Sequence, residues 1–173
     1  NTINQTSGGS KRRATYDKYL TVTSLVHTLV EVVAFNGNLL LNVGPRADGT
    51  IDPIFVDRLS GMGDWLRVNG EAIYSSRPWN VCQNETESAV YYTRREDVLY
   101  AILTEWPVDN RIHLNCPIPT AQTKVRLLGL PTDLSSSSSL GEHNNTTPIL
   151  FWSQTASVDV NQLSGGMEIQ LPI

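Results

Sequence analysis

The strongest apolar run in the chain extends from Leu39 to Val43 and is interrupted only by Asn42. Turn-forming residues bound it on both sides, as is typical of a strand buried on both faces of a parallel sheet. Parallel sheets and barrels bind their ligands at the carboxyl ends of the strands. Asn42, near that end of the run, is therefore the first candidate for a binding residue.

A helix is predicted before this run. Apolar residues recur at i, i+3, i+4, i+7, i+8 and i+11 from Val22 to Val33, which places them on one helical face. Thr21 or Thr23 is available as the N-cap, and Asn36-Gly37 is a typical C-terminal stop. Such a helix is expected to pack on a sheet.

A second helix is predicted after the run. Asp52 can cap it, Pro53 suits the first helical position, and Asn69-Gly70 ends it. Helix, strand and helix within roughly fifty residues is typical of a (β/α) barrel or a doubly wound sheet. The residues expected on its apolar face are Phe55, Leu59, Met62 and Leu66.

Beyond Trp79 the pattern changes to short β-branched or aromatic runs separated by turn sequences. Alternation of polar and apolar residues in two of the runs indicates antiparallel strands with one wet face. The fold class expected is therefore α/β plus all-β: the tail of a (β/α) TIM-like barrel in residues 1–78, then an antiparallel β-sandwich in residues 79–173. The expected strands are Ala89–Thr93, Val98–Thr104, Arg111–Asn115, Lys124–Leu128, Ile149–Trp152, Val158–Val160 and Met167–Leu171.

The composition is that of a soluble globular protein, with 40% hydrophobic and 17% charged residues in 173. A formal net charge of -4 gives no basic surface for nucleic acid or for an anionic membrane, and no apolar run approaches the length of a membrane span. We therefore expect neither partner. The polar stretch that begins at Asn1 has no start signal, which favours a piece of a longer protein.

Two weak signals together favour a secreted or lysosomal protein. Cys82 and Cys116 are even in number and can pair, although two buried thiols are an equally good interpretation. The second signal is a set of sequons for N-linked sugar, all in polar sequence of the kind found in loops. The candidate glycosylation sites are Asn4, Asn84, Asn144 and Asn145.

No motif for a metal, a phosphate or a nucleophile is found in the sequence. His27, His113 and His143 form no cluster, and the two cysteines are far apart along the chain. No metal site and no cofactor are therefore predicted. Glu71, at the junction of the two expected domains, is interpreted as a residue that makes a structural hydrogen bond.

Six segments follow one another in a specific order and spacing: Tyr19–Thr21, Leu25–Val33, Gly37–Pro45, Asp48–Ile51, Trp65–Tyr74 and Arg77–Trp79. This series resembles the C-terminal part of the retaining α-L-fucosidases, glycoside hydrolase family 29. A weaker resemblance continues through residues 90–93, 100–102 and 124–129. In that family a (β/α) barrel precedes a β-sandwich, which is the order inferred from the hydrophobic pattern.

The resemblance implies hydrolysis of terminal α-L-fucose by two carboxylates, a nucleophile and an acid/base. The family's nucleophile is an aspartate on an earlier barrel strand, outside this chain, so the chain alone is expected to be incomplete as an enzyme. The implied partners are a fucosylated glycan and the remainder of the barrel, and a homo-oligomer is also considered.

The family's acid/base loop corresponds to residues 7–14, where many relatives have an aromatic residue at positions 8 and 10 and a glutamate at 14. This chain has Gly8, Ser10 and Ala14, while Arg12 matches. Arg12 and Asn42 are therefore the predicted substrate-binding residues. The acid/base stays unassigned, with Asp17 and then Glu71 as substitutes.

Two alternatives stay open, of which the first is favoured by Gly8, Ser10 and Ala14. One is a catalytically silent homologue that binds fucose. The other is a β-domain that is itself a carbohydrate-binding module, although aromatic residues at strand spacing are more often core. The aromatics considered for sugar stacking are Tyr91, Tyr92, Trp106, Phe151 and Trp152.

Overall fold

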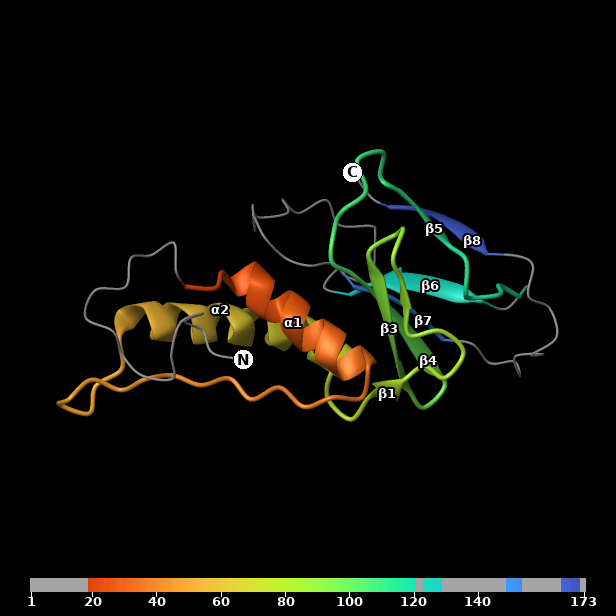
Figure 1. The fold of residues 1–173 in the computed structure, drawn as a ribbon. Coiled ribbons are helices and arrows are strands. Elements are labelled where there is room, and N and C mark those ends of the chain that lie inside the picture. The colour runs from red at the N-terminus through yellow and green to blue at the C-terminus, as the bar shows by residue number, and fades with distance from the viewer. Residues whose placement is uncertain (1–18, 121–122, 129–148, 154–165, 172–173) are drawn as a thin grey trace.

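The computed structural model describes residues 19–120, 123–128, 149–153 and 166–171 (Figure 1). Helices α1 (Val22–Ala34) and α2 (Pro53–Asn69) come first, followed by the short 3-10 helix η2 (Gly70–Ala72). The strands are β1 (Arg77–Pro78), β2 (Asn84–Glu85), β3 (Val90–Arg95), β4 (Val98–Leu103), β5 (Arg111–Leu114), β6 (Lys124–Leu127), β7 (Ile149–Ser153) and β8 (Met167–Gln170). The expected strand at 158–160 lies outside the described residues, as do Asn4, Arg12, Ala14, Asp17, Asn144 and Asn145.

Helix α1 begins and ends as the sequence predicts. The Thr21 hydroxyl accepts a hydrogen bond of 3.1 Å from the backbone N–H of Ser24, which satisfies one of the free donors of the first turn. Asn36, with φ of 60°, turns the chain away after the last turn. The buried stripe is Leu25, Val26, Val30 and Ala34.

Helix α2 differs from the prediction in two respects. Asp52 is the N-cap residue but makes no side-chain cap hydrogen bond, because its carboxylate binds the Arg46 side chain instead. Leu59 is 41% exposed, so its predicted burial is wrong. Successive residues of an α-helix are rotated by about 100°, so the buried face of α2 lies on the side of Trp65, and Leu59 lies at the edge of this face. The buried residues of α2 are Phe55, Met62, Trp65 and Asn69.

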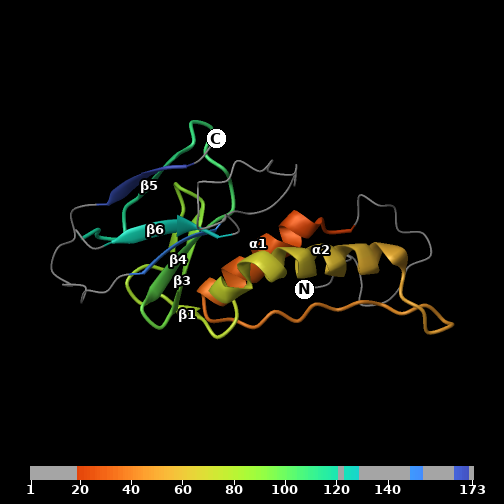
Figure 2. The ribbon, with the colours of Figure 1, turned by 180° about the vertical axis from the view of Figure 1, so that it is seen from behind.

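The segment from Gly37 to Thr50 runs back past α2, so that both helices point toward the β-strands (Figures 1 and 2). The predicted strand over 39–43 is not formed: Asn42 is a single bridge residue, and Leu40 is 80% exposed. A strand exists only through hydrogen bonds to neighbouring strands. Neither described sheet contains this segment.

Two antiparallel sheets account for the rest of the described chain. The larger has the order β1-β3-β4-β7-β6 with β2 also paired to β3, and the smaller pairs β5 with β8. Six of the seven predicted strands are thereby confirmed. The fold class is also as expected, α/β followed by an antiparallel β-sandwich.

The hairpin of β3 and β4 has a different hydrophobic core on each of its faces. Leu99, Ala101 and Leu103 pack with β5 and β8, whereas Tyr100 and Ile102 pack with α1 and α2. Alternation along a strand sends successive side chains to opposite faces, and here both faces are buried. The helices and the sandwich therefore share this hairpin.

No described helix is long and apolar enough to cross a membrane.

Candidate functional site

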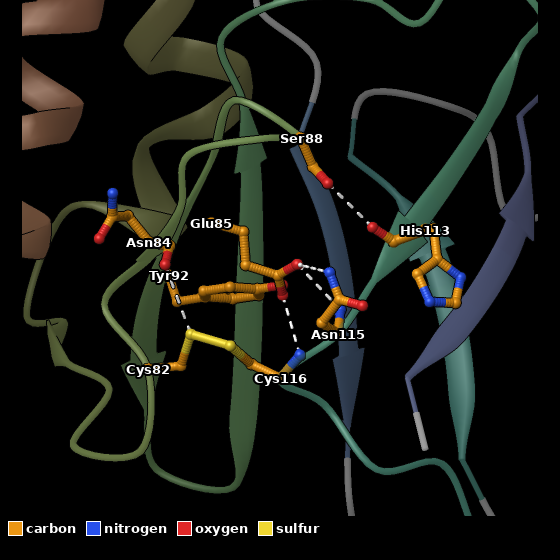
Figure 3. Close-up of a disulfide and its surroundings, with 8 residues drawn as sticks. All are labelled: Cys82, Asn84, Glu85, Ser88, Tyr92, His113, Asn115 and Cys116. Atoms are coloured by element: carbon orange, nitrogen blue, oxygen red, sulfur yellow. Dashed lines mark hydrogen bonds between the residues drawn. A yellow bond between two sulfur atoms is a disulfide. The ribbon is translucent and has the colours of Figure 1, made fainter. Parts of the chain in front are cut away.

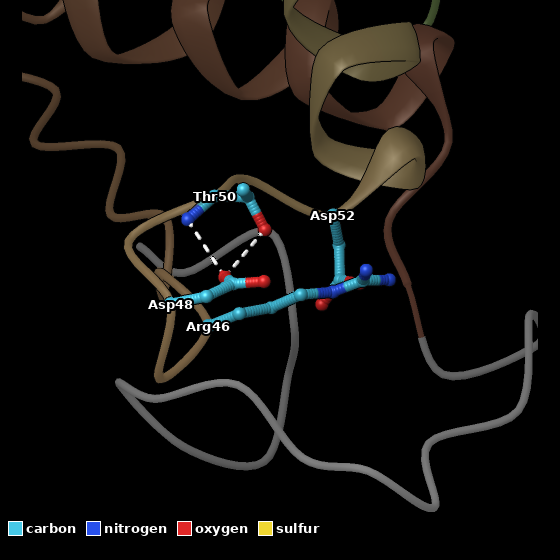
Figure 4. Close-up of polar contacts among 4 residues, drawn as sticks. All are labelled: Arg46, Asp48, Thr50 and Asp52. Carbon is cyan, nitrogen blue, oxygen red and sulfur yellow. Dashed lines mark hydrogen bonds and ion pairs between the residues drawn. The ribbon is translucent and has the colours of Figure 1, made fainter.

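A tight loop follows the Asn42 segment and leads into α2 (Figure 4). Pro45 and Ile51 form an antiparallel bridge, and the Arg46 N–H donates to the Thr50 carbonyl at 2.8 Å. Gly49 has φ of +83°, a left-handed conformation that glycine adopts without steric cost. The backbone of the loop is thus folded on itself rather than extended.

Side chains reinforce this loop. The Asp48 carboxylate accepts hydrogen bonds from the Thr50 hydroxyl at 2.7 Å and from the Thr50 N–H at 3.0 Å. The hydroxyl bond is the main reason that the pKa of Asp48 lies below its usual value. Arg46 Nε donates to Asp52 at 2.6 Å, which ties the loop to the start of α2 (Figure 4).

Asn42 lies three residues before this loop and is exposed. The structure thus places the predicted binding residue beside a fixed polar turn that carries a guanidinium and two carboxylates. Its role in substrate binding stays a prediction. The other predicted site residues of the catalytic half, Arg12, Ala14 and Asp17, are not among the described residues.

Glu71 lies in η2, between the helices and the sheet. Its side chain is hydrogen-bonded to that of Tyr100, which is 3% exposed. Burial, followed by the Glu71 carboxylate, raises the pKa of Tyr100 to about 12. This contact is the structural hydrogen bond expected of Glu71 at the junction.

Cys82 and Cys116 form a disulfide that connects the segment before β2 to the segment after β5 (Figure 3). Of the two interpretations left open by the sequence, pairing is confirmed. The bond joins residues 34 positions apart, and both cysteines pack at the margin of the sandwich core.

The carboxylate of Glu85 lies beside this disulfide and is buried, with 8% of the residue exposed. One oxygen accepts from the Tyr92 hydroxyl at 2.5 Å and from the Cys116 N–H at 2.9 Å. The other accepts from the backbone and side-chain N–H groups of Asn115, at 2.9 and 3.1 Å. Four donors compensate a buried charge that would otherwise be costly.

Cys82, Glu85 and Cys116 also bring three atoms of metal-ligand type within 4.8 Å of one another. Here the disulfide uses both sulfurs, and the four donors use the carboxylate. Burial, followed by the bond to Glu85, raises the pKa of Tyr92 above the ordinary range of a phenol, so Tyr92 remains a donor. The cluster is built to hold the sandwich together.

Glu85 carries no sequence signal of its role. It stands in a polar stretch and is the middle residue of the Asn84 sequon, where a solvated side chain is the ordinary expectation. Its burial follows from the pairing of β2 with β3, which sets Glu85 opposite Val90. A two-residue strand leaves no periodic signal in the sequence.

Two sequence families match the chain one after the other. The family described as Alpha-L-fucosidase covers residues 1–71, and Alpha-L-fucosidase C-terminal domain covers residues 83–156. Among curated relatives, an alpha-L-fucosidase of Branchiostoma floridae is 45% identical over 128 residues, which is 74% of this chain and 28% of that protein. The tissue alpha-L-fucosidase of Homo sapiens is 40% identical over 132 residues, 76% of this chain and 28% of that protein.

Solved structures agree with the sequence matches. The alpha-fucosidase of Thermotoga maritima, determined in complex with fucose, superposes with a TM-score of 0.70 at 31% identity. The match covers 89% of this chain and 39% of that one. The chain thus spans less than a third of the length of those two curated relatives. Taken together, the consecutive family matches and the shared fold show that this chain belongs to the α-L-fucosidase family and corresponds to the C-terminal part of such an enzyme.

Proposed function

We propose that the complete protein carrying this chain removes terminal α-L-fucose from glycans by a retaining mechanism. The observation that carries the proposal is the pair of fucosidase matches, which follow one another along residues 1–71 and 83–156. In a retaining glycosidase one carboxylate attacks the sugar and a second acts as acid and then as base. The nucleophile aspartate belongs to a barrel segment outside this chain.

In this proposal the described residues help to position the sugar and do not form a covalent bond with it. Asn42 precedes a loop whose Arg46–Asp52 contact fixes it against α2. A preorganised amide at this place can donate to or accept from a sugar hydroxyl without reordering the backbone. Arg12 is the second proposed substrate-binding residue.

The remainder of the barrel is the proposed partner of the segment from Gly37 to Thr50. Residues 1–78 are assigned to the barrel and 79–173 to the sandwich. Leu40, 80% exposed on an apolar run, is the kind of side chain that a neighbouring barrel strand would cover. Self-association remains a prediction.

The test is hydrolysis of 4-nitrophenyl α-L-fucoside by the complete protein, with the anomer formed first identified by proton NMR. We expect α-L-fucose as the first product and no release from the matching β-D-galactoside. Formation of β-L-fucose first would contradict retention. If a known fucosidase hydrolyses the substrate completely under the same conditions and this protein releases nothing at the same concentration, the proposed activity is contradicted.

The acid/base is a separate question, because Ala14 occupies its family position. An aryl leaving group needs little protonation, whereas a sugar alkoxide gains on the order of a hundredfold from acid catalysis. If nothing replaces the glutamate, activity on oligosaccharides will be nearly absent, and azide will restore turnover of the aryl fucoside as fucosyl azide. Full activity on oligosaccharides would show that another carboxylate serves, and Asp17→Asn, then Glu71→Gln, would identify it.

We also propose that the protein is a secreted or lysosomal glycoprotein. The Cys82–Cys116 disulfide is typical of an oxidising compartment. Asn84, the one sequon in the described residues, is partly exposed on β2. Enzymatic removal of N-linked sugar from the natural protein should lower its mass. The same treatment should lower the mass of Asn84→Gln by less, because this variant lacks the sugar at Asn84.

A further inference from the structure

Two loops and one strand of the sandwich line a half-open pocket of about 310 Å³. Residues 87–89, between β2 and β3, form one wall, and residues 105–108, between β4 and β5, form another. The third wall is the first part of β5, from Arg111 to His113. The volume is at the lower end of the range of about 300–1,000 Å³ that is usual for small-molecule sites, which suits a single sugar unit.

The walls of this pocket are held together by hydrogen bonds within the protein. The Ser88 hydroxyl donates to the His113 carbonyl at 3.0 Å (Figure 3). The Thr104 N–H and hydroxyl both donate to the Ala89 carbonyl, at 3.0 and 2.9 Å. The pocket is therefore formed before any ligand arrives, which reduces the entropy cost of binding.

Trp106 supplies an exposed aromatic surface at this pocket. It is 41% exposed, whereas Trp65 and Trp79 are 4% and 7% exposed in the two cores. Its indole N–H donates to the side-chain oxygen of Asn110 at 2.6 Å, which fixes the plane of the ring. A large exposed aromatic in a pocket, with its polar atom already satisfied, is available for stacking.

The charged residues that line the pocket are of both signs. Glu87 and Glu105 contribute carboxylates, and Arg111 contributes a guanidinium that lies 3.8 Å from the Glu168 carboxylate. His113 adds an exposed imidazole. Carboxylates and guanidinium groups are planar and bind neighbouring hydroxyls in pairs. The acidic residues Glu87 and Glu105 in the lining, and Glu168 beside Arg111, outnumber this one guanidinium and make the pocket unfavourable for an anion.

We propose that this pocket is a binding site for a neutral sugar unit of a glycan, with one apolar face of the sugar ring stacked on Trp106 and its hydroxyls bound by Glu87, Glu105 and Arg111. Sialylated or sulfated sugars bind less well because of the two carboxylates. The site needs no catalytic group, so it stands whether or not the protein hydrolyses fucosides.

The first test is a titration of the protein with lactose, followed by the NMR signal of the Trp106 indole N–H. Lactose is neutral and contains no fucose, so a fucose-specific site does not contribute to the signal. We expect saturable shifts at Trp106 with a Kd on the order of millimolar, which is usual for one stacked sugar. No binding at tens of millimolar lactose, on the order of ten times that Kd, would overturn the proposal.

Three variants separate stacking from general effects on the fold. Because these variants lack the indole, their lactose binding is measured from the backbone amide signals of residues 105–108. Trp106→Ala should weaken binding about tenfold, and Trp106→Phe should keep most of it because the ring face remains. Tyr74→Ala is the matched control: it removes an aromatic that is 59% exposed outside this pocket, and it should leave binding unchanged. Thermal melting confirms that each variant is folded. Equal affinities of Trp106→Ala and the wild type would contradict the site.

A second ligand tests the charge argument. 3'-Sialyllactose should bind at least about fivefold more weakly than lactose, since its carboxylate meets Glu87 and Glu105. In Glu87→Gln/Glu105→Gln this difference should shrink, because the amides keep hydrogen-bonding capacity without the charge. Tighter binding of the sialylated sugar by the wild type would show an anion site instead.

Discussion

The hydroxyl of Tyr92 donates a hydrogen bond of 2.5 Å to the buried carboxylate of Glu85. Tyr92 is completely buried on β3, and Trp79 meets its ring edge to face with centroids 5.2 Å apart. The same carboxylate accepts hydrogen bonds from the consecutive backbone N–H groups of Asn115 and Cys116. One buried charge therefore connects β2, β3 and the segment after β5.

Glu85→Gln should strongly destabilise the protein. The amide replaces one acceptor oxygen by an NH2 group, which then faces N–H or O–H donors, so buried groups lose their partners. We expect a loss of about 2–3 kcal/mol in the free energy of unfolding, measured by urea denaturation. Glu87→Gln, at an exposed site two residues later, should change it by less than about 0.5 kcal/mol. Equal midpoints for the two variants would contradict this role of Glu85.

Removing the disulfide should lower stability by a different route. The Cys82–Cys116 bond closes a loop with a sequence separation of 34 and so restricts the unfolded chain. Cys82→Ala/Cys116→Ala should lose about 2–4 kcal/mol in urea denaturation. Reductant should reduce wild-type stability toward that of the variant and leave the variant unaffected. If the wild type and the double variant unfold at the same urea concentration without reductant, the prediction fails.

Thr93→Val tests whether the helices and the sandwich unfold together. The buried Thr93 hydroxyl donates to the Ala72 carbonyl at 2.7 Å, across the junction of η2 and β3. Its loss should cost about 1–2 kcal/mol, while the exposed control Ser60→Ala should be near neutral. Helical ellipticity and tryptophan fluorescence should shift to the same lower melting temperature. Separate transitions for the two signals would indicate independent units.

Tyr100 should make the fold sensitive to alkali. Its pKa is raised from 10.0 to about 12 in the folded state, so the unfolded state loses the proton first. The stabilisation is complete below pH 10 and is lost as the pH rises through about 12. Tyr100→Phe should therefore show a shallower fall in stability over this range, measured by urea denaturation at stepped pH. A slope equal to that of Tyr74→Phe, an exposed control, would refute the assignment.

Asn42→Ala in the complete enzyme should lower kcat/KM for an aryl fucoside about tenfold or more, if its amide binds the sugar or a neighbouring catalytic group. Asn38→Ala, four residues earlier and also exposed, is the control and should have no effect. A change of less than about twofold for Asn42→Ala would make Asn42 a structural residue.

The helices were predictable because their signals are local. Thr21, Pro53 and Asn36 act within one turn of the helix ends, where the neighbouring sequence alone decides the conformation. Strands β3 and β4 were predictable from their β-branched and aromatic runs. The double burial of the hairpin was not, because Tyr100 and Ile102 are covered by helices more than thirty residues away along the chain.

The site was less predictable than the fold. Asn42 was proposed as a binding residue from its place at the end of an apolar run, and that role stays a prediction. The contacts that fix the neighbouring loop join Arg46 to Asp52 across a turn. Such pairings depend on three-dimensional geometry. The sequence predicted that the Asp52 side chain caps α2. In the structure this side chain instead forms an ion pair with Arg46.

The doubly buried β3–β4 hairpin also has a consequence for synthesis on the ribosome. α1 and α2 are made before the hairpin, so the apolar side chains that they pack against Tyr100 and Ile102 stay uncovered until those residues have followed. The next neighbour of β4 in the sheet, β7, is made some fifty residues later still. During that interval the nascent chain presents unpaired strand edges and exposed apolar side chains, the conditions under which chaperones bind. Substitutions that slow the closure of the hairpin should therefore reduce the yield of folded protein more than they reduce its stability.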